Sequence, residues 1–336
     1  MKTNVAVVGA SGFTGLELIK MLHLHPGFEI TYLANSSGDT TLEELHPAFA
    51  SVLSMKVEKL DCDTLATRAE LAFLALPHKE SMPVVKELLS LGIKVVDLSA
   101  DYRLELDTYE EVYTEHVDPD NLDRAVYGLP ELYRDELKSA SLVANPGCHA
   151  TGAILGILPF VNHITDGSAI FIDSKTGVSG AGKKCTETTH YVRVDENMFA
   201  YNAFAHRHAP EIREKVKDFS GKSFDMMFVP QLVPMVRGML VSCYITLDSV
   251  VDAQALLKEF YSGEPFVRIR ETPCETKQVA GTNFCDIYVK QKGRNLFVST
   301  ALDNLMKGAS SAAVANANLM CGYPEDMGVP KIAYVP

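Results

Sequence analysis

The sequence predicts an α/β protein in which a parallel sheet is followed by a mixed α+β domain. The first third of the chain alternates short apolar runs with helical patterns, and the apolar runs are uninterrupted, as in strands covered on both faces. Beyond Pro146 the strand-like runs alternate apolar with polar residues instead. The length of 336 residues corresponds to about two domains.

The first part of the chain supplies the parallel sheet. Buried strands are expected over residues 5–8, 28–34, 71–76, 94–98 and 141–144. Helices are expected over 16–24, where Pro26 ends the pattern, and over 80–91.

The second part supplies the mixed domain. Strands are expected over 239–247, 284–290 and 296–301, with a helix over 252–261. The last two strands flank Gln-Lys-Gly-Arg-Asn, which is typical of a hairpin connection. A helix rich in small residues is expected over 305–320 and could close either domain.

Composition excludes several classes of protein. With 31 Lys and Arg against 43 Asp and Glu, the net charge of −12 argues against non-specific binding to nucleic acid or to anionic membranes. The first apolar run ends at Gly9, and no run approaches the ~18 residues of a membrane span. Seven scattered cysteines without a C-x-x-C pair argue against a disulfide framework, so we expect a cytoplasmic protein with reduced thiols.

A glycine-rich turn after the first strand predicts a dinucleotide site. Its spacing is G-x-x-G-x-x-G, and it opens the first helix, where backbone N–H groups and the helix dipole can bind a pyrophosphate. The alternative is an ordinary strand–helix turn. The candidate contacts are Gly9, Ser11, Gly12, Phe13, Thr14 and Gly15.

The end of the second strand bears on the choice of nucleotide. Asn35, Ser36 and Ser37 stand where an acidic residue would hold the ribose of NAD, and their hydroxyls favour NADP. No Lys or Arg occurs between Met21 and Met55 to pair with the 2′-phosphate of NADP, and Asp39 leaves NAD open.

Cys148 is the candidate nucleophile. It lies in Asn-Pro-Gly-Cys-His-Ala-Thr-Gly, between a strand and an apolar helix, where the helix dipole stabilises a thiolate and free N–H groups could bind an oxyanion. The alternative is a buried structural cysteine, which is the role expected of the other six.

The segment His206-Arg207-His208-Ala209-Pro210 supplies candidate acid–base groups. Pro210 suits the first turn of a helix, so the preceding residues are expected to be extended, with His206 and His208 on one face and Arg207 on the other. A solvated helix entry is the alternative. No third ligand with diagnostic spacing accompanies the two histidines, so we expect no metal site.

Three further segments carry polar or glycine patterns. Gly177–Gly182 could be a turn or a second cofactor contact, and it lacks the final glycine of a hydrolase nucleophile elbow. Arg103 follows the strand over 94–98 and could be a surface cation or an anion clamp. The third segment is Asp303–Gly308.

These motifs together resemble the N-acetyl-γ-glutamyl-phosphate reductase family (type 1) of the aspartate-semialdehyde dehydrogenase superfamily. The resemblance runs through nearly the whole chain. It rests on GASGFTGLEL (9–18), FLALPH (73–78), VDLSADYRL (96–104), NPGCHAT (145–151), GVSGAG (177–182), HRHAPEI (206–212) and DNLMKG (303–308). His149 stands where Tyr is usual and Ala209 where Thr is usual, and both are expected to lie outside the reacting groups.

The resemblance implies a domain arrangement and a subunit interface. Residues 1–147 would form a Rossmann-like NADP-binding domain and 148–303 a catalytic and dimerisation α+β domain. Residues 304–336 would carry a helix that returns to the first domain. The resemblance also implies that the protein forms a homo-oligomer, either a dimer or a tetramer.

The resemblance also implies an NADPH-dependent reduction of an acyl phosphate in arginine biosynthesis, through a thioester on Cys148. His208 is preferred to His206 as the acid–base, because it lies nearer the helix start. Substrate contacts would come from Arg103 for the phosphate, and from Arg207 and His206. Further cofactor contacts would come from Ser36, Ser37, Gly180 and Asn304.

Three alternatives stay open at this point. A reductase of the aspartate or aminoadipate type shares the chemistry and differs in the substrate's length. A non-catalytic NADP sensor would leave Cys148 and both histidines idle, and a thiol hydrolase would leave the glycine turn unexplained.

Overall fold

The computed structural model describes residues 2–335 and divides the chain into two compact units. The first comprises the chain up to Pro146 together with Ala309–Val329, and the second comprises Gly147–Gly308 with the residues from 330 on. The second break therefore falls after Gly308, later than the expected residue 303. The last residues also join the second unit, because Pro330 and Tyr334 form backbone hydrogen bonds with the segment 280–283.

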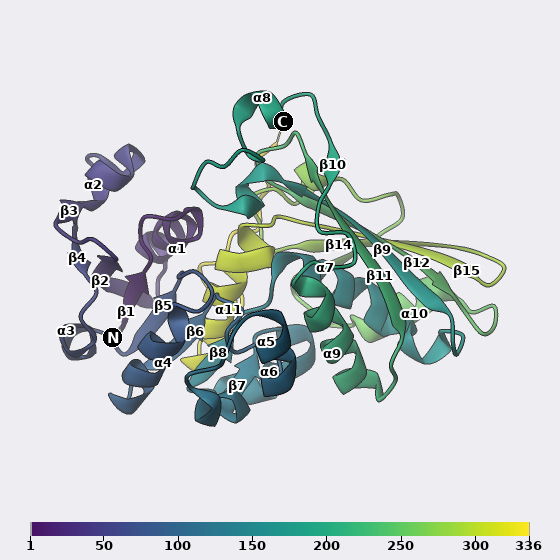
Figure 1. Ribbon diagram of the computed structural model, residues 1–336, viewed down its shortest axis with the longest axis horizontal. Coiled ribbons are helices and arrows are strands. Elements are labelled where there is room, and N and C mark those ends of the chain that lie inside the picture. The colour runs from purple at the N-terminus through teal and green to yellow at the C-terminus, as the bar shows by residue number, and fades with distance from the viewer. Residues whose placement is uncertain (1, 336) are drawn as a thin grey trace. The chain divides into compact units, whose positions relative to one another are not determined.

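The first unit is built on a sheet of eight strands. They are β1 (Thr3–Val8), β2 (Phe28–Asn35), β3 (Thr40–Thr41), β4 (Lys56–Lys59), β5 (Leu71–Leu74), β6 (Lys94–Asp97), β7 (Ala125–Tyr127) and β8 (Leu142–Ala144). The order is β3-β4-β2-β1-β5-β6-β8-β7, and every pair is parallel except β3 with β4 (Figure 1). The predicted parallel sheet is confirmed.

Helices accompany these strands in the first unit. They are α1 (Phe13–Leu24), α2 (Leu42–Leu45), α3 (Cys62–Arg68), α4 (Ser81–Ser90), α5 (Leu106–Val112), α6 (Pro130–Ser139) and α11 (Ser311–Met320). All side chains of β5 are buried, as expected of a strand covered on both faces. The expected C-terminal helix is split, because Met306–Ser310 form a π-helical turn before α11 begins. α11 belongs to the first unit and packs against α1 and α6.

The second unit is built on a mixed sheet of seven strands. Its strands are β9 (Ala169–Gly177), β10 (Phe199–Ala200), β11 (Asp225–Val233), β12 (Met239–Thr246), β13 (Val267–Arg270), β14 (Cys285–Lys292) and β15 (Asn295–Leu302). Its helices are α7 (Cys148–Ile157), α8 (Tyr191–Val194), α9 (His208–Ser220) and α10 (Ala253–Phe260). The strand order is β10-β11-β9-β12-β15-β14-β13, and β14 and β15 form the predicted hairpin.

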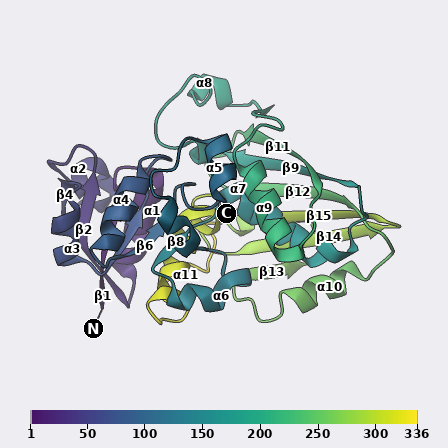
Figure 2. The same ribbon diagram turned by 60° about the horizontal axis from the view of Figure 1, so that its bottom comes forward.

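α7 packs closely on this sheet because two of its residues are glycines. A Cβ at Gly152 would lie 2.8 Å from Val241, and one at Gly156 would lie 3.2 Å from Thr300. α7 and α9 lie together over the sheet, on the side that faces the viewer in Figure 2. This packing fixes the first turn of α7, where Cys148 is located. Among the described residues, no helix has the length and apolar character needed to cross a bilayer.

Candidate active site

The glycine-rich turn between β1 and α1 has the geometry of a dinucleotide-binding turn. Gly9 has a φ of +91°, and a Cβ there would lie 2.3 Å from the Ala75 carbonyl oxygen, so only glycine fits. A Cβ at Gly15 would lie 2.3 Å from the Gly9 oxygen. At Gly12 the nearest atom would be 3.7 Å away, so the fold itself tolerates a side chain there and a closely approaching ligand would not.

The start of α1 offers hydrogen-bond donors to such a ligand. Gly12 is the N-cap, and no described side chain caps the first turn, which begins with Phe13 and Thr14 beside the half-buried Ser11. The N–H groups of a first turn, together with the helix dipole, suit a bound phosphate. The turn therefore fits the pyrophosphate of a dinucleotide.

The end of β2 presents two exposed hydroxyls and, beside them, a lysine from another strand. Asn35 is turned inward, and its Oδ1 accepts hydrogen bonds from the backbone N–H groups of Ser37 and Gly38 at 3.0 and 2.6 Å. Ser36 and Ser37 are exposed. β4 pairs with β2 so that Lys59, also exposed, lies opposite Asn35. No local sequence pattern indicates this cation, because Lys59 is placed beside β2 by strand pairing.

Cys148 is the first residue of α7, as predicted, and its side chain is half-buried. The N-cap is Gly147, which has no side chain to compete for the N–H groups of the first turn. Gly308 lies directly against the cysteine, since a Cβ there would come within 2.6 Å of the Cys148 Cβ. A thiol at this position benefits from the positive end of the helix dipole.

Other cysteines occupy very different environments. Cys243 lies in β12 and Cys285 in β14, both buried, as predicted. Burial raises the pKa of Cys243 to about 12 and that of Cys274 to about 11, so these thiols stay protonated and inert at neutral pH. They are structural residues of the core. Cys185 is exposed, which corrects the expectation that all six other cysteines are buried.

The backbone between the two histidines is helical rather than extended, which corrects the expectation from Pro210. Arg207 has helical dihedral angles and α9 begins at His208, because the first turn of a helix needs no N–H from its proline. The turn still brings the two histidines together. Their ring centroids are 4.9 Å apart, and the Nδ1 of His206 accepts a hydrogen bond from the His208 backbone N–H at 3.1 Å.

His149 lies inside this cluster, which corrects the expectation that it is remote from the reacting groups. Its ring centroid is 5.2 Å from that of His206 and 5.4 Å from that of His208. One ring nitrogen of His149, one of His208 and the sulfur of Cys148 all lie within 4.8 Å of one another. As the second residue of α7, His149 is turned toward α9, and the sequence alone does not reveal that orientation.

Two of the three histidines are neutral at physiological pH. Burial lowers the pKa of His149 to about 3. Burial, with a smaller contribution from the Arg207 charge, lowers the pKa of His206 to about 4. Both rings are therefore uncharged hydrogen-bonding groups, and that of His149 lies beside the thiol.

The two candidate substrate arginines differ in their surroundings. Arg103 is buried, which rules out a simple surface cation. Its Nε donates to the Asn145 carbonyl at 2.7 Å and its Nη2 to the Leu98 carbonyl at 2.8 Å, so the backbone fixes the plane of the guanidinium. Arg207 is exposed at the N-cap of α9.

The structure brings together the two remaining cofactor candidates, Gly180 and Asn304. A Cβ at Gly180 would lie 3.6 Å from Asn304 Nδ2. The Asn304 side chain donates to Ser179 Oγ at 3.0 Å and accepts from the Gly238 N–H at 2.8 Å. Asn304 thus holds the glycine loop over 177–182 in place.

Comparison with known proteins identifies the family. The semialdehyde dehydrogenase NAD-binding domain model matches residues 4–140, and the semialdehyde dehydrogenase dimerisation domain model matches residues 148–304. The chain is 57% identical over 333 residues to the N-acetyl-gamma-glutamyl-phosphate reductase of a Sulfurovum species, covering 99% of each chain. The protein of the same name from Wolinella succinogenes is 53% identical over 335 residues, covering 100% of this chain and 99% of the relative.

This chain belongs to the N-acetyl-γ-glutamyl-phosphate reductase family. It is therefore an oxidoreductase with an NAD(P)-binding domain.

Solved structures of the wider superfamily share the fold. Aspartate semialdehyde dehydrogenase II from Vibrio cholerae, complexed with ASA, aligns with a TM-score of 0.73 at 14% identity, over 96% of this chain and 99% of that one. The Candida albicans aspartate semialdehyde dehydrogenase with NADP aligns with a TM-score of 0.72 at 13% identity, over 96% and 99%.

Glu211 lies in the segment HRHAPEI, and the sequence alone assigned it no role. It is buried in the first turn of α9, and its Oε1 accepts a hydrogen bond from the Gly147 N–H at 2.8 Å. Glu211 thereby ties the N-cap of α7 to α9. It links the helix that carries Cys148 to the helix that carries His208.

Proposed function

We propose that this reductase converts N-acetyl-γ-glutamyl phosphate to N-acetylglutamate semialdehyde and phosphate, through a thioester on Cys148, with NADPH as the reductant. The observation that carries the proposal is the placement of the Cys148 thiol at the start of α7 within 4.8 Å of a His208 ring nitrogen. The substrate is the one named in the relatives' enzyme name, and arginine biosynthesis is the corresponding pathway.

Cys148 acts as nucleophile and later as leaving group. Its thiolate attacks the acyl carbon, the C–O bond to phosphate breaks, and phosphate leaves with that electron pair, which forms the thioester. The N–H groups of the first turn of α7 stabilise the oxyanion that develops during attack. A thiolate suits both roles, because it is a strong nucleophile near neutral pH and also leaves readily.

His208 moves the proton. As the thioester carbonyl is reduced, its oxygen gains negative charge, and His208 donates a proton to that oxygen. When the resulting thiohemiacetal collapses, the same imidazole takes the hydroxyl proton back. The C–S bond then breaks, the aldehyde leaves and the Cys148 thiolate is restored. His206 is neutral and supplies a hydrogen bond to the substrate.

The nucleotide would be held by the glycine turn over 9–15 and by the end of β2. When bound, the reduced nicotinamide supplies the hydride. NADP is favoured over NAD because Ser36 and Ser37 offer exposed hydroxyls and Lys59 adds a cation from the neighbouring strand. Gly180 and Asn304 are proposed to contact the nucleotide as well.

Arg103 and Arg207 are proposed to bind the negative groups of the substrate. The guanidinium of Arg103 is oriented by two backbone carbonyls, and an oriented guanidinium recognises phosphate well. Arg207 is exposed and is assigned the substrate carboxylate. Both assignments keep anionic groups close to cations that cannot lose their charge at neutral pH.

The open face of the second sheet is the proposed homodimer interface. Met227, Phe171, Tyr244 and Phe297 lie opposite one another on β11, β9, β12 and β15, and form an apolar row. Phe171 and Tyr244 are each about half exposed in the single chain, at 49% and 48%. An exposed apolar row of this kind is typical of subunit contacts, and the dimerisation model covers these strands.

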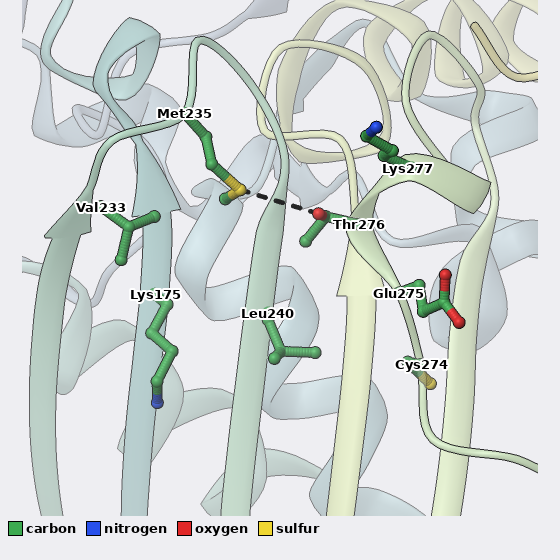
Figure 3. A pocket seen from close by; sticks show the side chains of 8 residues that line it. All are labelled: Lys175, Val233, Met235, Leu240, Cys274, Glu275, Thr276 and Lys277. Atoms are coloured by element: carbon green, nitrogen blue, oxygen red, sulfur yellow. Dashed lines mark hydrogen bonds between the residues drawn. The ribbon is translucent and has the colours of Figure 1, made fainter. Parts of the chain in front are cut away.

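The same face also holds a pocket of about 410 Å³ at the ends of the strands (Figure 3). Its lining residues are Lys175, Val233, Met235, Leu240, Cys274, Glu275, Thr276 and Lys277. The Thr276 hydroxyl donates to the Met235 sulfur at 3.7 Å across the pocket. In the proposed dimer, a side chain of the partner subunit would fit into this pocket.

The reverse reaction tests the proposed function. Purified protein, N-acetylglutamate semialdehyde, phosphate and NADP should form NADPH only when all components are present. Aspartate semialdehyde and NAD serve as parallel controls. Turnover of aspartate or aminoadipate semialdehyde instead would replace the substrate and keep the chemistry. Tight NADP binding without turnover of any aldehyde would favour a sensor, and nucleotide-independent hydrolysis would favour a thiol hydrolase.

A further inference from the structure

Cys148, His149 and His208 have the composition of a zinc site. Their sulfur and two ring nitrogens lie within 4.8 Å of one another. In a tetrahedral zinc site, with bonds of about 2.0–2.3 Å, neighbouring ligand atoms are about 3.5 Å apart. Cys148 and His208 are half-buried, so their side chains have room to close the remaining distance. A thiolate with two imidazoles is a soft donor set that selects zinc over magnesium or calcium.

The surroundings of His149 also suit a metal ligand. Its Nδ1 lies 2.7 Å from the Ser174 hydroxyl and its Nε2 lies 3.1 Å from the Tyr201 hydroxyl. A histidine that binds a metal through one ring nitrogen usually donates a hydrogen bond from the other. Ser174 can accept that hydrogen bond from Nδ1–H. A small rotation of Tyr201 would then open Nε2 to a cation.

We propose that Cys148, His149 and His208 together bind a thiophilic divalent cation such as Zn²⁺, with water as the fourth ligand, and that this cation reversibly inhibits the enzyme. Binding forms a zinc–sulfur bond and releases the thiol proton, with no change of oxidation state. Inhibition rests on the proposed function, because the cation occupies the nucleophile and the acid–base together. Tyr is usual at position 149 in the family that the chain resembles, so the third ligand is a feature of this chain.

Cobalt binding tests the site without relying on turnover. Co²⁺ added to the full-length protein should bind with one equivalent, with thiolate-to-cobalt charge-transfer absorption and the intense visible bands of four-coordinate cobalt, and Zn²⁺ should displace it. Cys148→Ser should abolish the charge-transfer band. His149→Gln and His208→Gln should each weaken binding by more than about tenfold.

The exposed Cys185 provides the matched control, since it is the thiol best placed for adventitious metal binding. Cys185→Ser should leave the cobalt spectrum unchanged. Loss of the spectrum in Cys185→Ser, or its retention in folded His149→Gln and His149→Tyr proteins, would overturn the proposal. Circular dichroism establishes that each variant is folded.

Zinc inhibition is the functional readout. Zn²⁺ should inhibit wild-type turnover and a chelator should restore it. Ser174→Ala, which removes the hydrogen-bond partner of His149, should raise the inhibitory zinc concentration by about tenfold. If turnover is normal but zinc does not inhibit it, and no cobalt–thiolate band is seen, the metal site is refuted and the proposed function stands. Absent turnover with a normal cobalt spectrum would refute the proposed function alone.

Discussion

At the scale of single residues, the three clustered histidines differ in burial, and their proposed roles follow from that difference. His149 and His206 are held neutral by burial, which lowers their pKa values to about 3 and about 4. His208 is the first residue of its helix and is only half-buried. One of its ring nitrogens lies within 4.8 Å of the Cys148 sulfur, so it is the imidazole proposed to exchange a proton with the reacting group.

Replacing each histidine in turn tests this division. His208→Asn should lower kcat by about 10²–10⁴-fold, as expected for loss of a general acid, and should remove one limb of the pH–rate profile. His206→Asn should mainly raise KM and leave the profile's midpoints unchanged, because a pKa of about 4 keeps His206 neutral above pH 5. Steady-state kinetics from pH 5 to 9 distinguish the two. If His206→Asn instead loses one limb of the pH–rate profile, His206 rather than His208 is the acid–base residue.

The sequence predicted the position of Cys148 but not its neighbourhood. A strand, a glycine and an apolar helix define the turn that presents the thiol, and this local pattern is readable in the chain. The proximity of His149 depends on how α7 packs against α9. That packing is set by contacts between segments far apart in sequence, so no local pattern records it.

At the scale of secondary-structure elements, Glu211 joins the two helices that carry Cys148 and His208. Its carboxylate accepts the hydrogen bond of the buried Gly147 N–H, which the N-terminus of α7 cannot satisfy internally. The two helices therefore keep a fixed spacing at the site.

Removing this link should loosen the site. Glu211→Ala leaves a buried N–H unpaired and should cost about 1–3 kcal/mol of stability, measured by urea unfolding. Glu211→Gln keeps an oxygen acceptor and should cost less. Both should lower kcat. Equal stability of Glu211→Ala and the wild type would show that the hydrogen bond contributes nothing to the fold.

The pairing of β2 with β4 places Lys59 at the end of β2, where the nucleotide's ribose is expected. Lys59→Glu should therefore lower kcat/KM for NADPH much more than for NADH, because it replaces a favourable charge with a repulsive one. The matched control is Lys56→Glu, at the opposite end of β4. An unchanged NADPH to NADH ratio in Lys59→Glu would remove Lys59 from the nucleotide site.

Strand patterns were readable where they were strongly apolar, as in β5, or clearly alternating, as in β12. β5 and β6 were predicted within a few residues, but β9 and β11 were missed. β9 ends in polar residues, and β11 contains Pro230, which normally argues against a strand interior. β11 nevertheless pairs with β9 over its whole length, so tertiary pairing overrides the local preference.

At the scale of the whole molecule, the apolar row on the open face of the second sheet is the proposed dimer interface. Tyr244→Glu should convert the dimer to a monomer, because it places a charge at the centre of the proposed interface. Val250→Glu, at another strongly exposed apolar position, should leave the dimer intact. Sedimentation velocity measures the oligomeric state of each variant. A Tyr244→Glu protein that stays dimeric would place the interface elsewhere.

The division into units was readable near Cys148 and less so near the C-terminus. A strand–helix switch with proline and glycine marks the first break, whereas the second falls inside a continuous helical pattern. There a π-helical turn over 306–310 precedes α11 and keeps Gly308 against Cys148. A sequence pattern with helical spacing does not distinguish such a turn from an α-helix.

Trapping the acyl-enzyme tests the central claim most directly. The protein is mixed with N-acetyl-γ-glutamyl phosphate and oxidised NADP, which cannot donate a hydride, then quenched in acid and analysed by peptide mass spectrometry. We predict one equivalent of phosphate released in a burst and an N-acetylglutamyl group on Cys148, with neither in Cys148→Ser. A phosphate burst with the acyl group on another residue, or normal turnover by Cys148→Ser, would contradict the thioester mechanism.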